Sequence, residues 1–296
     1  MRRYLDPKND FAFKRLFGTE QNKDLLIQFL NAVLDGVHSR VEEVELLPLS
    51  STPEIANLRQ SIVDALCRGE DGRQFIIEMQ CARESSFIKR AAAYASRVYL
   101  NQRTKEGEGG YGSLSPVIFL AIVDFDLFPQ KEAYISHHKI TDIYTHECDI
   151  KDFSFSFIEL RKFRKEIDEL HSEIDRWLYF FRHAAHTEPD ELRKIKEDYP
   201  GIEKAYSTMS DATYTEAELL EYERYAMKED VIATAISDAR REGRAEGMEE
   251  GRAEGMEEGI EVGKRETAKN LLAMGLTVEQ VAKGTGLSME EVEEIS

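Results

Sequence analysis

The chain has 296 residues, of which 42% are hydrophobic and 32% are charged, a composition that allows a sizeable buried core. Its three cysteines, Cys67, Cys81 and Cys148, form no CxxC pair, which argues against a disulfide framework and favours a reducing, cytoplasmic location. No apolar run approaches the length of about 18 residues that a membrane span needs, so we expect no membrane association.

The net charge of −18 is unevenly spread along the chain. Residues 1–105 hold 16 basic and 14 acidic side chains, whereas residues 106–200 and 201–296 carry net charges of −8 and −12. Only the first third can therefore approach a phosphate backbone without strong repulsion. For a nucleic-acid partner, this distribution predicts weak and salt-sensitive contact.

The first predicted elements are two helices and a strand. Asp6 is expected to cap a helix that has Pro7 at its first position and ends near Gly18. A second helix is expected over residues 22–34, where apolar residues recur at helical spacing, and an edge strand over residues 42–49. The apolar side chains of the first helix exceed what an exposed helix needs, which predicts that it packs on a sheet.

Residues 61–80 predict a β-hairpin, because two apolar, β-branched runs flank a polar turn that contains glycine. If the hairpin is symmetric about Asp71, Asp64 lies opposite Glu78, with the two Cβ atoms about 5 Å apart. Gln80 shares the face of Glu78, since side chains alternate along a strand. A register shift of one residue would place the two acids on opposite faces.

Two carboxylates at this separation repel each other unless a cation lies between them. A hard divalent cation such as Mg²⁺ binds carboxylate oxygens, keeps some of its waters and can also hold a phosphate oxygen. The alternative is that Asp64 and Glu78 are solvated side chains, because antiparallel hairpins often keep one polar face. Their spacing alone does not decide between the two.

The residues also carry a family resemblance. Asp64, thirteen intervening residues and then the tripeptide EMQ (residues 78–80) resemble the D…ExK motif of PD-(D/E)xK nucleases, in the variant with glutamine at the lysine position. Residues 4–18, YLDPKNDFAFKRLFG, resemble the opening of the recombination-promoting nuclease and putative transposase family of that superfamily. Val63 stands where proline is usual, and Gln80 can neither carry a charge nor take a proton.

The resemblance implies an α/β fold with a restriction-endonuclease-like mixed sheet flanked by helices, followed by a helical C-terminal region. It implies that Asp64 and Glu78 hold Mg²⁺, or Mn²⁺, that the Met79 carbonyl adds a ligand, and that Gln80 orients the attacking water. The implied function is metal-dependent endonucleolytic hydrolysis of DNA, linked to recombination or mobile elements. The rival hypothesis is a catalytically inactive scaffold that binds protein partners through its acidic helices and tail.

Four further residues are candidates for DNA contact or for support of the acids. The first helix of related nucleases often contributes an acid, which makes Asp10 a candidate; the alternative is an ordinary acid that favours the helix dipole. Lys14 can meet a phosphate or remain solvated. Residues 85–101 predict a helix on which Arg90 and Tyr94 would line the site, as in related nucleases, and the alternative for Tyr94 is structural packing.

The middle of the chain predicts more sheet and then a long helix. Residues 116–125 are apolar on both faces, which is typical of a central buried strand, and further strand is expected over residues 134–157. His146 and Cys148 lack a second ligand pair, so we favour a structural role over a metal site. Apolar residues at spacings of three and four predict one helix over residues 158–185.

The last part of the chain contains a glycine at every fourth residue from Gly243 to Gly263. Six glycines in a helix cost about 1 kcal/mol each relative to alanine, so we expect a weak, highly charged helical spacer. Glycine would also permit close helix pairing in a homo-oligomer. Residues 266–295 predict three short helices that resemble a helix-turn-helix, but four glutamates in the last helix oppose DNA recognition.

These expectations divide the chain into four segments. They are a nuclease core (1–157), a helical region (158–241), a glycine-repeat spacer (242–264) and a helix-turn-helix-like tail (265–296). The expected partner is DNA, and the C-terminal helices are the expected place for homo-oligomer contacts.

Overall fold

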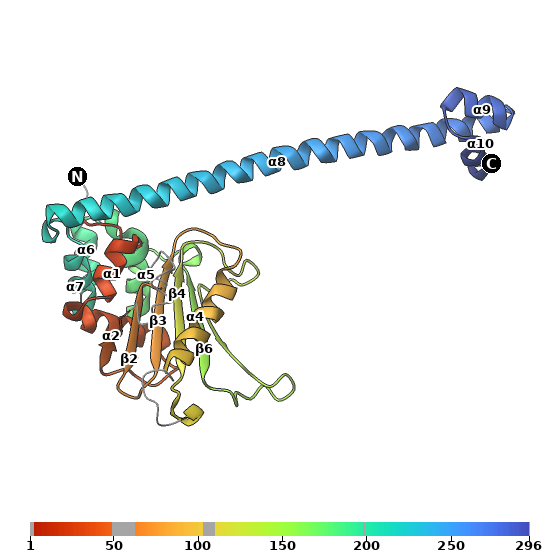
Figure 1. Cartoon of the computed structure of the whole chain (residues 1–296). Coiled ribbons are helices and arrows are strands. Elements are labelled where there is room, and N and C mark those ends of the chain that lie inside the picture. Colours follow the sequence, from red (N-terminus) through yellow and green to blue (C-terminus); the bar gives the residue numbers. More distant parts are fainter. Residues whose placement is uncertain (1–2, 49–62, 103–109, 198, 296) are drawn as a thin grey trace. The chain divides into compact units, whose positions relative to one another are not determined.

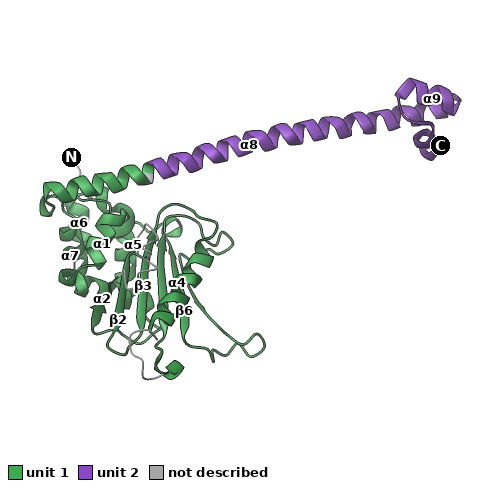
Figure 2. Ribbon diagram, in the orientation of Figure 1, with its two compact units in different colours: residues 1–230 green, residues 231–296 purple. Residues whose placement is uncertain are grey.

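The computed structural model describes residues 3–48, 63–102, 110–197 and 199–295. The chain forms two compact units, Met1–Asp230 and Val231–Ser296, which are coloured separately in Figure 2. The first unit contains a mixed six-stranded sheet with helices on its faces (Figure 1), which confirms the expected fold class. No helix in the described ranges combines the length and the apolar character needed to cross a bilayer.

The sheet has the strand order β1-β2-β3-β4-β6-β5. Strands β3, β4 and β6 run parallel to one another, whereas the β1–β2, β2–β3 and β5–β6 pairs are antiparallel. All seven residues of β4 are buried, as expected for a central strand, and β1 lies at an edge. The strands are β1 (Val44–Leu46), β2 (Ala65–Gly69), β3 (Gln74–Gln80), β4 (Val117–Val123), β5 (Ile135–Lys139) and β6 (Phe153–Glu159).

The β2–β3 hairpin has the register that the sequence predicts. Cys67 pairs with Phe75 and Ala65 with Ile77, so one more step along the ladder sets Asp64 opposite Glu78. Residues 61–62, at the start of the expected hairpin, lie outside the described ranges. The turn depends on Gly72, which has a φ of +85° and whose added Cβ would lie 2.8 Å from the Ser115 hydroxyl oxygen.

Each face of the sheet is covered by a different set of helices. On one face, Phe75, Ile77 and Met79 of β3 join a core that includes buried residues of α1, α2, α5, α6 and α7. On the other face, Ile76 packs against α4. The helices of the first unit are α1 (Asp10–Phe17), α2 (Lys23–Leu34), α4 (Phe87–Asn101), α5 (Glu173–His183), α6 (Pro189–Lys196) and α7 (Pro200–Thr208), and 3-10 turns occur at Glu20–Asn22, Gly110–Ser113, Leu160–Lys162, Ile167–Glu169, Ala184–His186 and Asp211–Thr213.

Aromatic side chains join the helices of the first core. Phe17 of α1 stacks on Phe29 of α2 with ring centroids 5.1 Å apart, and both rings contact Trp177 of α5. All three side chains are fully buried. Burial of such large apolar surfaces fixes α1 against the helical region that follows the sheet in sequence.

Two expected helix starts are wrong. Helix α1 begins at Asp10 rather than after Asp6, because the Asn9 side chain accepts hydrogen bonds from the backbone of its first turn, whereas Asp6 accepts from the Lys8 amide in the preceding turn. The single helix expected over residues 158–185 does not form. Strand β6 continues to Glu159, and α5 starts only at the capping box of Ser172.

The second unit contains most of α8 (Glu216–Ala273), followed by α9 (Val278–Thr285) and α10 (Met289–Ile295). The first of the three short helices expected in the tail is therefore the end of α8, while the capping box of Thr277 and Gln280 forms as expected. A small core of Ala268, Val281, Leu287 and Val292 holds this unit together. The glycine repeat is helical and exposed, and a homo-oligomer through these helices remains a prediction.

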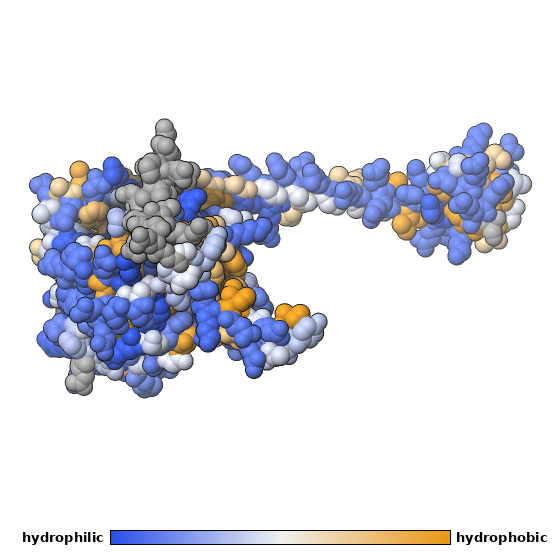
Figure 3. Space-filling view, turned by 60° about the horizontal axis from the view of Figure 1, so that its bottom comes forward, coloured by the Kyte–Doolittle hydropathy of each residue, from blue (hydrophilic) through white to orange (hydrophobic). Residues whose placement is uncertain are grey.

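The visible surface in Figure 3 is largely hydrophilic, in keeping with the charged composition. In the first unit, strongly exposed apolar side chains occur between β5 and β6, at Ile143, Tyr144 and Ile150. The four-segment division of the chain remains a prediction.

We expect Gly72→Ala to lower the free energy of unfolding by about 1–2 kcal/mol, because alanine is strained at a positive φ. Its Cβ would also meet the Ser115 hydroxyl. Urea unfolding followed by circular dichroism measures the change. Gly112→Ala is the matched control, since an added Cβ there meets no atom within 4 Å; equal stability of the two variants would contradict the turn assignment.

Candidate active site

Two carboxylates meet at the end of the β2–β3 hairpin. Asp64 lies one residue before β2 and Glu78 lies near the end of β3, and their exposed fractions are only 7% and 8%. The Met79 amide donates a hydrogen bond to Asp64 Oδ2 at 2.8 Å, which ties the Asp64 carboxylate to β3. The register of the hairpin therefore determines the position of both acids.

One cation approaches each acid. Lys14 of α1 lies with its Nζ 3.5 Å from Asp64 Oδ1, and Arg90 of α4 lies with its Nη2 3.5 Å from Glu78 Oε1. Helices α1 and α4 pack on opposite faces of the sheet. The paired acids thus receive positive charge from two separate elements of the fold.

Asp64 and Glu78 lie in surroundings that disfavour their charged forms. Burial raises the pKa of Asp64 to about 6 and the charge of Asp10 adds to the effect, although the Met79 amide and Lys14 oppose it. Burial also raises the pKa of Glu78 well above its usual range, with further contributions from the charges of Asp64 and Asp10. The site therefore favours binding of a proton or of a cation.

Glu78 Oε2 is buried and has no hydrogen-bond partner. Leaving a buried acceptor unpaired costs about 1–3 kcal/mol, and a divalent cation would remove that cost while offsetting the repulsion between the acids. Within the described ranges, no three His, Cys, Asp or Glu side chains converge to hold a metal. Two carboxylate side chains are donors of the kind that a hard divalent cation binds.

Gln80 already has partners at both ends of its amide. Its Nε2 donates to the Ala82 carbonyl at 2.8 Å, and its Oε1 accepts a hydrogen bond from Arg90. Arg90 also forms an ion pair with Glu84. Sequence reasoning placed Gln80 on the face of Glu78 but did not foresee that Arg90 would hold it.

The other candidate residues lie around the acids. Asp10 and Lys14 occupy adjacent turns of α1, and the charges of both act on Glu78. The Arg90 guanidinium lies 5.9 Å from the ring centroid of Tyr94, and burial raises the pKa of this tyrosine. The fold therefore brings together all four residues that the sequence singled out beside the acids.

The sequence did not predict an ion pair at the end of the neighbouring strand β4. Lys8 Nζ contacts Asp124 Oδ2 at 2.9 Å, and the Asp124 amide donates to the Gln80 carbonyl. Asp124 follows directly after β4, which is parallel to β3. The rule that the carboxyl ends of adjacent parallel strands carry ligand-binding residues could have identified it.

The sequence model of the family described as "PD-(D/E)XK nuclease family transposase" matches residues 7–235. The matched range includes all the residues around the two acids and ends close to the boundary of the first unit. Comparisons with curated proteins and with solved structures gave no match.

In the metal-free protein, we expect Asp64→Asn to change how stability depends on pH. Folding raises the pKa of Asp64 from 3.8 to about 6, so the folded state binds this proton more tightly than the unfolded state. The contribution of the bound proton to wild-type stability is therefore full below pH 3.8 and is lost as the pH rises through about 6. The variant should be more stable than wild type by roughly 2–3 kcal/mol at pH 8 and about equal to it below pH 4.

Urea unfolding in EDTA at several pH values tests this expectation. Asp190→Asn is the control, because the Asp190 side chain is 90% exposed. A constant difference between Asp64→Asn and wild type across this pH range would count against the buried, proton-binding carboxylate.

Proposed function

This chain belongs to the PD-(D/E)XK nuclease family transposases, and from that premise we propose that it is a metal-dependent DNA endonuclease that serves recombination or transposition. The observation that carries the proposal is the buried pair of Asp64 and Glu78, with one Glu78 oxygen left without a partner. A purely structural pair of acids would be expected to have all its oxygens satisfied.

We assign the metal ligands to Asp64, Glu78 and the Met79 carbonyl, with Mg²⁺ as the ion and Mn²⁺ as its substitute. When bound, such an ion lowers the pKa of a water and stabilises negative charge on the phosphate. The Met79 amide supports this assignment from the protein side, because its hydrogen bond holds the Asp64 carboxylate against β3.

Gln80 is proposed to orient the attacking water. Arg90 and the Ala82 carbonyl fix its amide, so the side chain is held in one orientation before the substrate arrives. Glutamine cannot accept the proton of the attacking water, so removal of this proton would rely on the bound metal or on a second water. The water oxygen bonds to phosphorus as the bond to the leaving-group oxygen breaks.

DNA is the proposed partner, and the charge distribution supports its approach to this part of the chain. Residues 1–105 carry a small excess of basic side chains, in contrast to the acidic remainder. Lys14 and Arg90 lie beside the acids, with side chains that are 28% and 26% exposed. Such contacts give binding that weakens as salt is raised. A cytoplasmic location is proposed on the basis of the three free cysteines.

A scaffold without catalytic activity remains the second candidate. The observation in its favour is Gln80, a residue that neither ionises nor transfers a proton and whose amide is already hydrogen bonded. A scaffold would need the fold of the first unit but would not need the paired acids.

Nicking of supercoiled plasmid by the purified protein distinguishes the two. We expect nicking in Mg²⁺ that is abolished by EDTA and reduced about 100-fold or more by Asp64→Ala, since this change removes a metal ligand. Asp190→Ala is the control for loss of one exposed acid. Folded protein that fails to nick in Mg²⁺ and in Mn²⁺ would favour the scaffold.

Arg90→Gln is expected to lower the nicking rate by about 10- to 100-fold, because residues that orient the ligands of a metal typically have effects of this size. The variant removes the group that contacts both Glu78 and Gln80. Arg97→Gln, an exposed arginine on the same helix, removes an equal charge without touching either residue. An equal reduction in both variants would show that Arg90 contributes charge alone, and a wild-type rate for Arg90→Gln would show that it contributes nothing.

A further inference from the structure

We propose that Lys14 supplies from helix α1 the positive charge that this chain lacks at position 80, and that it acts as a positioning residue through the Asp64 carboxylate. This inference rests on the proposed nuclease function. Lys14 Nζ lies 3.5 Å from Asp64 Oδ1, and its charge also acts on Glu78. Lys14 thus pairs with one acid and acts through its charge on the other, from a different element than the one the motif predicts.

Lys14 is the cationic partner of Asp64. Asp10 from α1 and Glu78 from β3 add negative charge, and the Met79 amide donates a hydrogen bond. The Arg90 guanidinium instead forms ion pairs with Glu78 and Glu84 and donates a hydrogen bond to Gln80. Lys14 therefore has a role that Arg90 does not duplicate.

Lys14 is held by contacts on two elements besides its own helix. Its Nζ approaches the Asp64 carboxylate, and its side chain is 28% exposed, whereas the Asp64 side chain is 9% exposed. The same Nζ lies 6.0 Å from the ring centroid of Tyr225, in the part of α8 that belongs to the first unit. The ammonium group is therefore held between an aromatic ring and a carboxylate.

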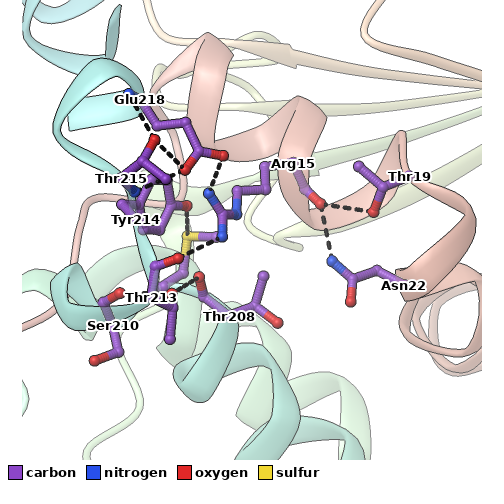
Figure 4. Close-up of polar contacts among 10 residues, drawn as sticks. Arg15, Thr19, Asn22, Thr208, Ser210, Thr213, Tyr214, Thr215 and Glu218 are labelled. Carbon is purple, nitrogen blue, oxygen red and sulfur yellow. Dashed lines mark hydrogen bonds and ion pairs between the residues drawn. The ribbon is translucent and has the colours of Figure 1, made fainter. Parts of the chain in front are cut away.

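The neighbouring residue, Arg15, anchors the last turn of α1. Arg15 pairs with Glu218, donates to the Thr213 carbonyl at 2.8 Å and covers the Tyr214 ring at 3.8 Å, as Figure 4 shows for the polar contacts. The Asn9 side chain caps α1 and also donates to the Tyr222 carbonyl. With α1 held at both ends, Lys14 is placed before substrate binds, which reduces the entropy cost of the reaction.

Lys14→Met and Lys14→Arg test the proposal by cleavage kinetics and by calorimetric titration of Mn²⁺ in the absence of DNA. We expect Lys14→Met to lower kcat about 10- to 100-fold with little change in KM. We expect the same variant to bind Mn²⁺ about 3- to 10-fold more tightly, because a positive charge next to the ligands is removed. Lys14→Arg keeps the charge and should restore most of kcat.

Lys23→Met is the matched control. Lys23 of α2 is similarly exposed, at 29%, and pairs with Glu20 instead of Asp64. This variant removes the same charge from a helix that carries no candidate site residue, so we expect its Mn²⁺ affinity to stay within about 2-fold of wild type.

Unchanged or weaker Mn²⁺ binding by folded Lys14→Met would overturn the proposal, as would a kcat equal to that of wild type. A merely structural lysine would weaken metal binding and lower the unfolding temperature together. If wild-type protein does not cleave DNA, the nuclease function fails, whereas the Mn²⁺ titration still reports the interaction between Lys14 and the acids.

Discussion

The burial of two like charges at the end of one hairpin is the constraint on which the rest of the first unit depends. The ladder of β2 and β3 sets Asp64 and Glu78 opposite each other, and the sheet and helices exclude water from both. Buried carboxylates are costly unless they are paired or bind a cation. The Met79 amide, Lys14 and Arg90 offset part of this cost, and one oxygen of Glu78 remains unpaired.

The helices that follow the sheet in sequence help to position the side chains around the two acids. Trp177 of α5 packs on Phe17 and Phe29, while Arg15 and Asn9 bind residues in and just before α8. These contacts determine where α1 lies, and α1 carries Asp10 and Lys14. The family match to residue 235, rather than to the end of the sheet, agrees with this dependence.

Local patterns predicted the elements whose partners are close in sequence. The hairpin, its register, α2, α4 and the buried strand β4 all follow from alternation, helical periodicity or turn chemistry. The helix expected over residues 158–185 failed because Ile158, Leu160 and Phe163 are buried at the end of β6 and in the turn after it, where tertiary packing overrides their spacing.

The sequence named the candidate residues of the site but not the contacts between them. The motif supplied Asp64, Glu78 and Gln80 as candidates, and the resemblance to related nucleases supplied Arg90 and Tyr94. The approach of Lys14 to Asp64 depends on the position of α1, which distant aromatic and polar contacts determine. No local signal in the sequence carries that information.

Gln80 and Arg90 are best understood together. A lysine at position 80 would bring an ammonium group against the Arg90 guanidinium, where glutamine instead offers an amide oxygen that accepts a hydrogen bond. Two cations on this face would repel each other and compete for Glu78. A neutral residue at position 80 is therefore compatible with Arg90, and positive charge reaches Asp64 from α1, which packs on the other face of the sheet and carries Lys14.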